Sequence, residues 1–514
     1  MEAVQSVVIV GGGTAGWLTA GIIAARHQAR IKAGTFSVTL VESPDIKIIG
    51  VGEGTWPTMR ATLERIGVSE TAFFRECDAA FKQGGQFAGW TTGARDDSYY
   101  HPLMFPQGFA QVNLVPHWLR EGQGRSFCDF VTPQGRLCDE GLAPKTISNA
   151  EYRGPANYAY HLDAGKFAPF LARHCTGNLG VRHVLADITE VKQRESGDID
   201  SVLTRQAGAI AGDLFVDCSG FSALLIGKTL GVPFKSCSDV LFCDTALAVQ
   251  VPFATPDAPM ASHTIATAHG AGWTWDICLP TRRGVGYVYS SRHTTEEQAR
   301  ETLLRYIGAQ HADLPVRKIP IRAGHREVFW KNNCVAIGLA SGFLEPLESS
   351  AIVLVELSAK LLAEQMPACR EVMDIVAKRF NDVTMYRFGR IIDFLKLHYV
   401  LTRRTDTAFW RDNTDPASVP ERLRDLLTLW SYHSPWFFDE LDRLEEVFPA
   451  ASYQYVLYGM GFKTKVAPEE TIDTAMAAAR LVRENDQATG DMRARLPKNR
   501  ELLNKIYQYG LQPV

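Results

Sequence analysis

The sequence predicts an α/β protein with a mostly helical C-terminal part. First, a run of β-branched residues ends in a glycine-rich turn at Gly11 and leads directly into an apolar helix. Second, alternating apolar and polar residues between positions 247 and 291 are typical of β-strands. Third, apolar residues recur at helical spacing over 371–399, 421–430 and 471–483. The chain therefore begins as an α/β body and ends as helices.

The first thirty residues match the strand, turn and helix of a dinucleotide-binding unit. The turn has the pattern Gly-x-Gly-x-x-Gly, at Gly11, Gly13 and Gly16. Gly11 permits a tight turn, Gly13 lets the backbone approach a pyrophosphate, and Gly16 lets the helix pack closely on the strand. Thr14 and Ala15 lie at the helix N-terminus, whose N–H groups face the phosphates. We expect these five residues to bind a dinucleotide.

The residues after the first helix indicate which dinucleotide binds. A second strand, 36–41, ends in Glu42, which can accept hydrogen bonds from ribose hydroxyls and would repel a 2′-phosphate. FAD or NAD is therefore favoured over NADP. The glycine-rich loop 48–57 follows, and Gly50 and Val51 within it are expected to lie against the cofactor. A plain surface connection is the alternative for this loop.

Composition limits the class of protein. The chain has 514 residues, of which 46% are hydrophobic and 22% charged, enough for one large or two ordinary cores. A net charge of −3 gives no electrostatic reason to bind nucleic acid or an anionic membrane. The ten cysteines form no Cys-x-x-Cys pair, and no uncharged apolar stretch is long enough to cross a bilayer. We expect a soluble cytoplasmic protein that binds neither nucleic acid nor membrane.

Several isolated residues are candidates for a substrate site. Lys82 follows a helix expected to run to Phe81, and its amine would lie in a cleft if the stem is buried; a solvated lysine is the ordinary alternative. His101 lies in a loop-rich insertion at about 90–160 and is a candidate wall of that cleft. Trp273 and Trp275 share one face of an expected strand, where two indoles would form a rigid partition or simply pack in a core.

A second cluster precedes the helix expected at 352–366. Gly338 and Leu339, in the preceding strand, are assigned to the cofactor site. Glu345 and Glu348 flank the helix N-terminus, and a carboxylate fixed there is a plausible general base, with helix capping as the alternative. We therefore expect residues 1–360 to form the cofactor-binding body. Residues 361–514 are expected to form a helical region that covers the substrate.

These motifs together resemble one family. The glycine pattern, Lys82, Trp273-x-Trp275-x-Ile277 and Glu345-Pro-Leu-Glu348-Ser occur in the order and spacing of the flavin-dependent halogenases. The chain resembles the tryptophan-halogenase group over nearly its whole length. The resemblance implies an FAD-binding two-dinucleotide-fold flavoprotein, similar to flavin monooxygenases. It further implies that a separate NAD(P)H-dependent flavin reductase supplies FADH2, which diffuses to this protein and with O2 oxidises chloride or bromide to hypohalous acid.

The resemblance also implies roles for particular residues. Lys82 would hold or covalently carry the electrophilic halogen beside the substrate, and Glu348 would stabilise the cationic ring and take its proton. Ser349, Ser350 and Ala351 match the stretch that binds flavin and halide in the family. That stretch is usually Ser-Thr-Gly, and Cys278 replaces a proline that usually ends the tryptophan signature. The preference between chloride and bromide is therefore left open.

The substrate is expected to be an electron-rich aromatic ring of the indole type, since the insertion is rich in aromatic residues. Recognition of free tryptophan would require partners for its ammonium and carboxylate. The stretch 448–455, which includes Tyr453 as a substrate-binding candidate, shows no acid near its aromatic residues. Free or substituted indole is therefore favoured over tryptophan.

Other functions are kept as alternatives. A flavin-dependent aromatic hydroxylase would share the glycine pattern but would not need Lys82 and Glu348 together. A non-haem iron enzyme would use His161-Leu-Asp163 or His311-Ala-Asp313, although His-x-Asp is common by chance. A non-enzymatic flavin-binding module would leave Lys82 and Glu348 unexplained. A homodimer stays open.

Overall fold

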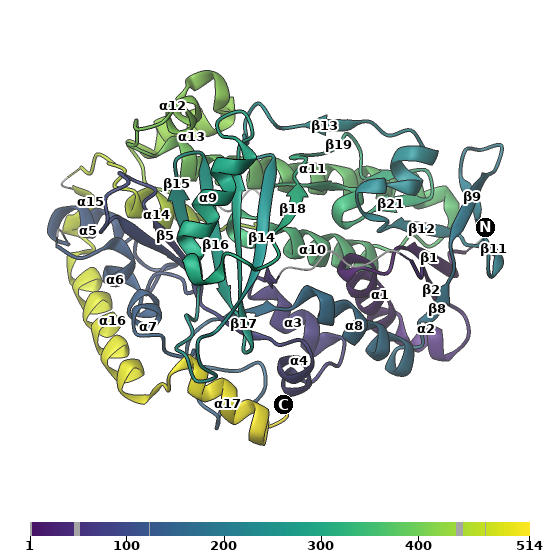
Figure 1. Ribbon diagram of the computed structural model, residues 1–514, viewed down its shortest axis with the longest axis horizontal. Helices are drawn as coiled ribbons and strands as arrows, with labels where there is room; N and C mark the ends of the chain where they lie inside the picture. Colours follow the sequence, from purple (N-terminus) through teal and green to yellow (C-terminus); the bar gives the residue numbers. More distant parts are fainter. Residues whose placement is uncertain (1–2, 46–51, 123, 438–445, 468) are drawn as a thin grey trace. The chain divides into compact units, whose positions relative to one another are not determined.

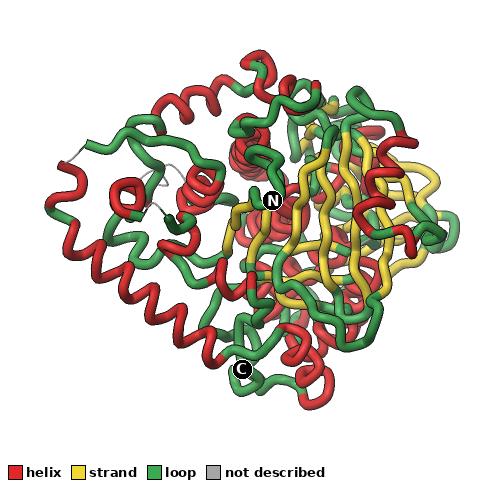
Figure 2. The backbone as a smooth tube through the Cα atoms, turned by 60° about the vertical axis from the view of Figure 1, so that its left-hand side comes forward, coloured by secondary structure: helices red, strands yellow, loops and turns green. Residues whose placement is uncertain are grey.

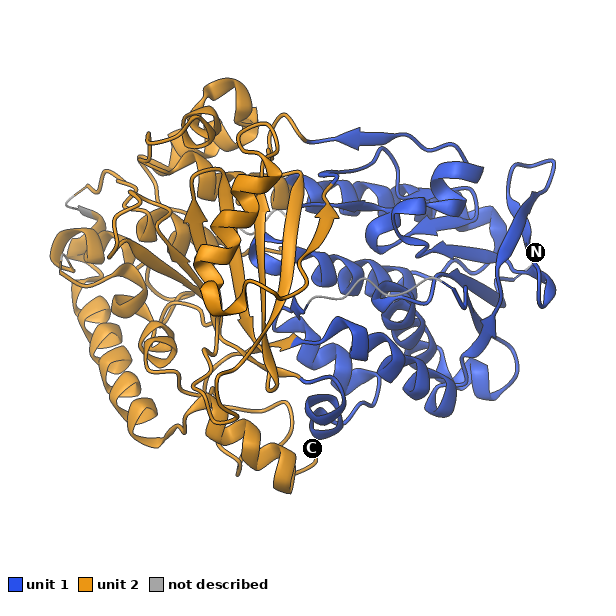
Figure 3. Cartoon of the chain, viewed as in Figure 1, with its two compact units in different colours: residues 1–78, 162–237, 322–389 blue, residues 79–161, 238–321, 390–514 orange. Residues whose placement is uncertain are grey.

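The computed structural model describes residues 3–45, 52–122, 124–437, 446–467 and 469–514. By its internal contacts the chain divides into two compact units, each assembled from three segments (Figure 3). Unit 1 contains residues 1–78, 162–237 and 322–389, and unit 2 contains residues 79–161, 238–321 and 390–514. The boundary expected after residue 360 falls inside helix α10 (Ser350–Glu364).

Unit 1 is built on a six-stranded sheet in the order β20-β21-β12-β1-β2-β8 (Figure 1). Its strands are β1 (Ser6–Val10), β2 (Ser37–Glu42), β8 (Arg182–Leu185), β12 (Leu214–Asp217), β20 (Trp330–Lys331) and β21 (Cys334–Ala336). β1 pairs in parallel with both β2 and β12, with Val10 opposite Asp217. The predicted dinucleotide-binding strands are therefore confirmed, and the first β-strand lies inside the sheet.

The helices of unit 1 cover this sheet. They are α1 (Thr14–Arg26), α2 (Gln28–Lys32), α3 (Thr58–Arg65), α4 (Glu70–Glu76), α8 (Ala164–Asn178) and α10, with short helical turns η1 (Gly220–Ser222), η2 (Leu224–Thr229), η4 (Gly338–Ala340) and η5 (Leu347–Ser349). Residues 16–24 of α1 are all buried, because the helix packs against α8 and α10 as well as against the sheet. This all-round burial explains the continuous apolar sequence of α1.

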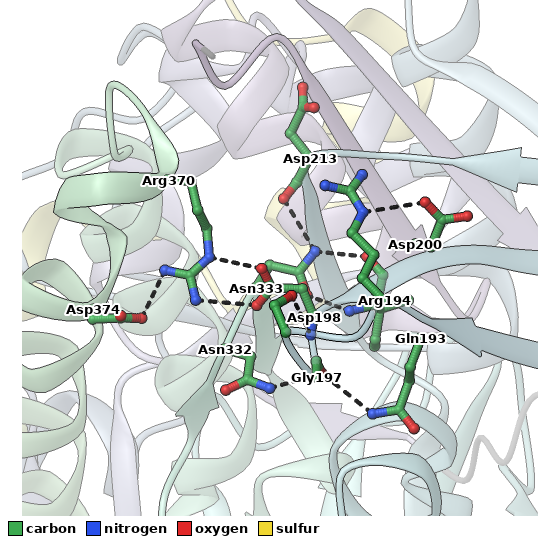
Figure 4. A network of polar contacts seen from close by, with 12 residues as sticks. Gln193, Arg194, Gly197, Asp198, Asp200, Asp213, Asn332, Asn333, Arg370 and Asp374 are labelled. Atoms are coloured by element: carbon green, nitrogen blue, oxygen red, sulfur yellow. Dashed lines mark hydrogen bonds and ion pairs between the residues drawn. The ribbon is translucent and has the colours of Figure 1, made fainter. Parts of the chain in front are cut away.

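Two smaller sheets complete unit 1. One contains β9 (Ile188–Gln193), β10 (Ile199–Thr204) and β11 (Gly208–Ala211); the other contains β13 (Phe234–Ser236), β19 (Gly324–Arg326) and β22 (Gly342–Phe343). Strand β3 (Glu53–Gly54) also belongs to this unit. Polar contacts join β10 to its surroundings (Figure 4): the Asn333 amide bonds both backbone groups of Ile199, and Arg370 donates two hydrogen bonds to Asp198.

Unit 2 is built on a seven-stranded sheet in the order β18-β14-β17-β16-β15-β5-β6 (Figure 2). Its strands are β5 (Gly84–Ala88), β6 (Ser98–Pro102), β14 (Thr245–Pro252), β15 (Thr264–His269), β16 (Gly272–Cys278), β17 (Arg282–Tyr289) and β18 (Arg317–Pro320). Helix α9 (Glu296–Ile307) covers one face, where its Leu303 packs with Val285 and Tyr287 of β17. The predicted strands between 247 and 291 are confirmed.

The other elements of unit 2 are the strands β4 (Ala80–Lys82) and β7 (Ala159–Leu162), which pair antiparallel, and a set of helices. The helices are α5 (Val115–Glu121), α6 (Phe127–Val131), α7 (Gln134–Asp139), α12 (Ala408–Thr414), α13 (Glu421–Trp430), α14 (Ala450–Gly459), α15 (Glu469–Ile472), α16 (Ala475–Arg495) and α17 (Asn499–Tyr509), with short turns η3 (Ala309–His311) and η6 (Pro416–Ser418).

The predicted C-terminal helices are largely confirmed. Helix α11 (Arg370–Val400) begins in unit 1 and ends in unit 2, and α13 matches the predicted 421–430. The helix predicted at 471–483 is instead split, with the longer α16 reaching Arg495. Within the described ranges, no helix combines the length and apolar character that a membrane crossing requires.

Candidate active site

The three pattern glycines of unit 1 are explained by different contacts. Gly11 has a φ of +116°, and a Cβ there would lie 2.2 Å from the carbonyl oxygen of Cys218. A Cβ on Gly16 would lie 1.8 Å from the carbonyl oxygen of Gly11. Both positions therefore need glycine to let strand β1, its turn and helix α1 fit together. By contrast, Gly13 directly precedes α1, and a Cβ on it would meet no protein atom within 4 Å.

The open space at Gly13 fits a bound dinucleotide. Helix α1 begins after Gly13 without a side-chain cap and without an acidic residue in its first turn. Its first N–H groups have no intrahelical partners and carry the positive end of the helix dipole. The protein packing gives no reason for glycine at position 13, whereas a pyrophosphate approaching the backbone does. The residues present therefore fit the phosphates of FAD.

Glu42 lies beside the same turn. Its carboxyl carbon is 2.0 Å from where a Cβ of Gly12 would stand, so Gly12 must be glycine for Glu42 to adopt this position. Glu42 Oε2 lies 3.0 Å from Nε2 of His183 on β8, a partner that no sequence motif indicated. Gly12, Glu42 and His183 line a cavity of about 360 Å³ together with Trp17 and Arg173. That volume is within the range of small-molecule sites.

The second predicted cofactor segment lies against α1. Gly338 was predicted in a strand, but β21 ends at Ala336 and Gly338 begins the turn η4 with a φ of +73°. A Cβ there would lie 2.6 Å from Cβ of Ala15. Leu339 follows and is half-buried. Unit 1 thus places Gly338 against Ala15, two residues that the sequence analysis assigned to the cofactor site. The other predicted cofactor residues, Gly50 and Val51, lie outside the described residues.

Glu348 and Ser349 form an unusual turn at the start of α10. Their φ angles are +66° and +56°, in the left-handed region that residues other than glycine rarely occupy. The Trp56 indole donates a hydrogen bond of 2.8 Å to the Glu348 carbonyl oxygen, which helps to hold the turn. Ser350 is buried and begins the helix, and Ala351 is exposed. A left-handed residue followed by a right-handed one aims successive N–H groups at one point, as in anion-binding nests.

Lys82 lies on a strand, so the prediction of a helix up to Phe81 was wrong. Helix α4 ends at Glu76, and Asp78 has a φ of +46°, which a continuing helix cannot accommodate. The chain then forms β4, which pairs antiparallel with β7, and Phe81 packs edge-on against Tyr158 at 5.2 Å. Lys82 is 4% exposed. The interpretation of a solvated lysine is therefore excluded.

His101 lies on β6, directly opposite Gly85 of β5, and is buried. Its ring lies 5.6 Å from Phe394 and 6.2 Å from Tyr455, between centroids, so it is one wall of an aromatic cluster. Residues 103 and 104, which follow β6, are held by Gln134, a residue that the sequence analysis did not single out. Its Oε1 accepts hydrogen bonds of 2.7 Å from the N–H groups of residues 103 and 104.

Trp273 and Trp275 are confirmed on one face of a strand, β16. That face is opposite the one covered by α9, because Thr274 and Asp276, which alternate with the two indoles, pair with Tyr287 and Val285 of the core beneath α9. Trp273 is 1% exposed and its ring lies 6.2 Å from that of Trp90. The Trp275 ring covers Gly286 of β17, where a Cβ would come within 2.1 Å of it. Close packing thus fixes both indoles.

Tyr453 on α14 lies among aromatic and charged residues. Its ring is 4.9 Å from that of Phe394, and the Arg390 guanidinium lies 5.2 Å above it. Glu446 Oε2 is 3.8 Å from Nε of Arg390, and the Glu446 side chain is 7% exposed. The expectation of no acid near these aromatic residues was therefore wrong. Glu446 stands two residues before the stretch searched, and Arg390 comes from a distant part of the sequence.

The His-x-Asp pairs have other contacts. His161 Nε2 lies 2.8 Å from Thr264 Oγ1, and Asp163 accepts a hydrogen bond from the Gly165 N–H and caps α8. His311 ends the short turn η3. In the part of the chain that the structure describes, no group of three or more metal-ligating side chains is gathered.

The chain is similar to halogenases along most of its length. The protein-family model for tryptophan halogenase matches residues 6–476. Tryptophan 6-halogenase SttH of Streptomyces toxytricini is 36% identical over 484 residues, which cover 89% of each chain. Tryptophan 7-halogenase RebH of Lentzea aerocolonigenes is 35% identical over 428 residues, covering 80% of this chain and 79% of RebH. A crystal structure of a tryptophan halogenase from Shewanella frigidimarina superposes with a TM-score of 0.97 at 46% identity, covering 100% of this chain and 99% of that one.

The parallel sheet and the glycine-rich turn at the N-terminus of α1 define a dinucleotide-binding enzyme of the flavoprotein class. The matches over nearly the whole chain show more: the chain belongs to the tryptophan halogenase family of flavin-dependent halogenases. The resemblance stated from the sequence is therefore confirmed, as is the α/β flavoprotein fold with its helical C-terminal part.

Proposed function

We propose that this protein uses FADH2, O2 and chloride or bromide to halogenate an electron-rich ring of the indole type. The observation that carries the proposal is the burial of Lys82 on β4, in the unit that also holds the aromatic cluster of His101. Burying a charged amine is costly, which makes a buried lysine in a substrate-binding unit a candidate functional group, and an aromatic hydroxylase of the same fold has no use for one. A buried amine suits transfer of an electrophilic halogen.

Unit 1 would hold the cofactor and the halide. The turn Gly11–Gly16 would bind the pyrophosphate, and Glu42 would bind the ribose hydroxyls. The N–H groups at Ser349, Ser350 and Ala351 would bind halide, because the α10 N-terminus has no side-chain cap and follows a left-handed turn. Bound FADH2 with O2 would supply hypohalous acid. A separate NAD(P)H-dependent flavin reductase would provide FADH2 by diffusion.

Lys82 and Glu348 would carry out the transfer to the ring. Lys82 would hold the hypohalous acid or carry its halogen so that the halogen faces the substrate. The ring carbon gains the halogen and becomes cationic, and the hydroxyl group takes a proton from the Lys82 ammonium and leaves as water. Glu348 would stabilise the positive charge and take the proton from the same carbon, which restores the aromatic ring. His101, Tyr453 and the Trp273 and Trp275 face would position the substrate.

Substitution of the two residues tests these roles. Lys82→Ala is expected to abolish halogenated product while FADH2 reoxidation continues near the normal rate. Glu348→Gln should lower product formation by roughly 10²–10⁴-fold, the usual cost of removing a positioned base. Lys145→Ala removes another fully buried lysine of unit 2, bonded to the Ala150 carbonyl, and should leave the product yield per FADH2 unchanged. Halogenation by Lys82→Ala would refute the central role of Lys82.

The reductant distinguishes a halogenase from a hydroxylase. A halogenase of this type should be inert with NADPH alone and should form product only when a flavin reductase or FADH2 is added. Product analysis by mass spectrometry then shows whether halogen or oxygen enters the ring. Rapid NADPH oxidation by the purified protein with a hydroxylated product would overturn the proposal in favour of the monooxygenase alternative.

The preferred substrate is free or substituted indole. Arg390 and Glu446 lie beside Tyr453 but are paired with each other, so a zwitterion would have to break their ion pair before binding. Tryptophan is the second candidate, because SttH and RebH are named for it and because Arg390 and Glu446 carry the charges that would complement a carboxylate and an ammonium.

A competition assay decides between these substrates. Indole and L-tryptophan are mixed in equal amounts with the enzyme, a flavin reductase and either halide, and the products are separated by mass. If indole is preferred, Glu446→Gln should change its halogenation little. If tryptophan is preferred, Glu446→Gln should raise its KM by about tenfold or more, since a charged hydrogen bond is worth roughly 1.5–3 kcal/mol. A preference for tryptophan together with this rise in KM would overturn the proposed preference for indole.

A further inference from the structure

A buried histidine lies beside Lys82 on the β4–β7 pair. The register places Ala80 opposite His161 and Lys82 opposite Ala159. Opposed residues of an antiparallel pair point to the same face, and so do residues two apart on one strand. Lys82 and His161 are therefore diagonal neighbours on one face, within reach of long side chains. Ala80 and Ala159 are the other residues of β4 and β7 on this face.

One nitrogen of the His161 ring is engaged and the other is not. Nε2 lies 2.8 Å from Thr264 Oγ1 on β15, which fixes the plane of the ring. Nδ1 is buried and has no hydrogen-bond partner among the residues that the structure describes, and His161 as a whole is 0% exposed. A buried polar nitrogen left in this state usually has a function or an unseen partner.

His161 is neutral in this setting. Burial, and then the positive charge of Lys82 and the nearby His263, hold the pKa of His161 well below its usual value. Burial lowers the pKa of His263 to about 4, and burial raises the pKa of Tyr100, whose ring lies 5.4 Å from that of His263. His263 and Tyr100 are therefore uncharged at neutral pH. After burial, the charge of Lys82 on β4 is the largest influence on the pKa of His161.

We propose that His161 is a positioning residue for Lys82, which offers Nδ1 as the hydrogen-bond acceptor for the lysine amine. When Nε2–H donates to Thr264 Oγ1, Nδ1 carries the lone pair, and a neighbouring ammonium favours this tautomer. The four-carbon stem of Lys82 lets its amine turn toward β7 and meet this lone pair. His161 would thus stabilise the protonated amine and restrict its positions. This inference rests on the proposed role of Lys82 in halogen transfer.

Three substitutions of His161 separate the roles of its nitrogens. His161→Phe keeps a ring but removes both polar atoms. His161→Asn places an amide oxygen near the position of Nδ1, and His161→Gln places one near the position of Nε2. The matched control is His325→Phe, because His325 is also buried but lies in unit 1 against Phe329 and Phe388. Thermal unfolding shows which variants fold.

The first measurement is the pKa of Lys82 in each variant. The Cε signal of Lys82 is followed against pH in protein labelled with [13C]lysine, and it is assigned by its loss in Lys82→Ala. His161→Phe should lower the Lys82 pKa by about one unit, as expected for the loss of a hydrogen bond to a charged group. His161→Asn should recover most of this change and His161→Gln less. His325→Phe should leave the Lys82 pKa unchanged.

The second measurement is halogenated product per FADH2 oxidised. His161→Phe should lower this ratio by about tenfold while FADH2 oxidation continues, because a misplaced reactive group costs rate. An unchanged Lys82 pKa in a folded His161→Phe protein would overturn the inference, as would equal behaviour of the Asn and Gln variants. If the wild-type protein halogenates no ring, the proposed function fails, but the pKa measurement still decides whether His161 acts on Lys82.

Discussion

The free energy of unfolding is expected to fall as the pH rises, because of Glu356 in unit 1. The Glu356→Gln substitution should remove this fall. Glu356 lies on α10, two turns beyond Glu348, and is 2% exposed. Its carboxyl group accepts hydrogen bonds of 2.6 Å from Thr62 Oγ1 and 3.2 Å from Thr58 Oγ1. Burial raises the pKa of Glu356 to about 8, and the two hydrogen bonds only partly oppose this.

The size and sign of the effect follow from linkage. Between pH 4.5 and about 8 the folded protein keeps the Glu356 proton while the unfolded chain releases it. This contribution is therefore fully present below pH 4.5, falls by about 1.4 kcal/mol per pH unit, and is lost by about pH 8. The total is about 5 kcal/mol. Glutamine carries no proton to release, so the variant should lack this slope.

Urea unfolding at pH 5.5, 7 and 8.5 measures the difference. At pH 5.5 the glutamine variant should be less stable than the wild type by about 1–3 kcal/mol, because its amide N–H groups need acceptors that Thr58 and Thr62 supply poorly. At pH 8.5 the order should reverse. Glu364→Gln is the control, since Glu364 lies on the same helix with an exposed side chain. Parallel pH curves for the wild type and Glu356→Gln would refute the reasoning.

Two further predictions concern the FAD site. Gly13→Ala should leave the unfolding free energy nearly unchanged but weaken FAD binding by about tenfold or more, whereas Gly16→Ala should destabilise the fold because its Cβ would strike the Gly11 carbonyl. Fluorescence titration with FAD measures the first effect and urea unfolding the second. An FAD affinity in Gly13→Ala equal to that of the wild type would contradict the assignment of Gly13. His183→Phe should weaken FAD binding severalfold, because it releases Glu42 from its 3.0 Å contact with His183. If calorimetric titration finds an unchanged FAD affinity, this contact does not position Glu42.

The nucleotide-binding part of the fold could be predicted because its signals are local. The strand residues, the glycines and the helix N-terminus of β1 and α1 follow one another within about twenty positions. Glycine is needed at Gly11 and Gly16 for backbone contacts that any chain with this turn would make. Such contacts follow from the strand–turn–helix geometry itself, so a sequence pattern can specify them.

The position of Lys82 could not be predicted in this way. The apolar sequence before it suits a helix, and nothing local indicates that Asp78 takes a left-handed conformation. Pairing of β4 with β7 then fixes the residue, although β7 begins nearly eighty positions later. The contacts of His183 with Glu42 and of Arg390 with Glu446 also join residues far apart in the sequence. Local propensity carries no information on such pairs.

The β4–β7 pair explains how Lys82 is held firmly although a long, loop-rich stretch follows it. The first segment of unit 2 runs from residue 79 to residue 161, and the pairing of Ala80 with His161 joins its two ends. Once these ends are paired, changes of loop length between them add little entropic cost and need not move the paired strands. Lys82 and His161 thus lie on the paired strands at the two ends of this segment. The loops between them, which shape substrate recognition, can vary without displacing the Lys82 amine.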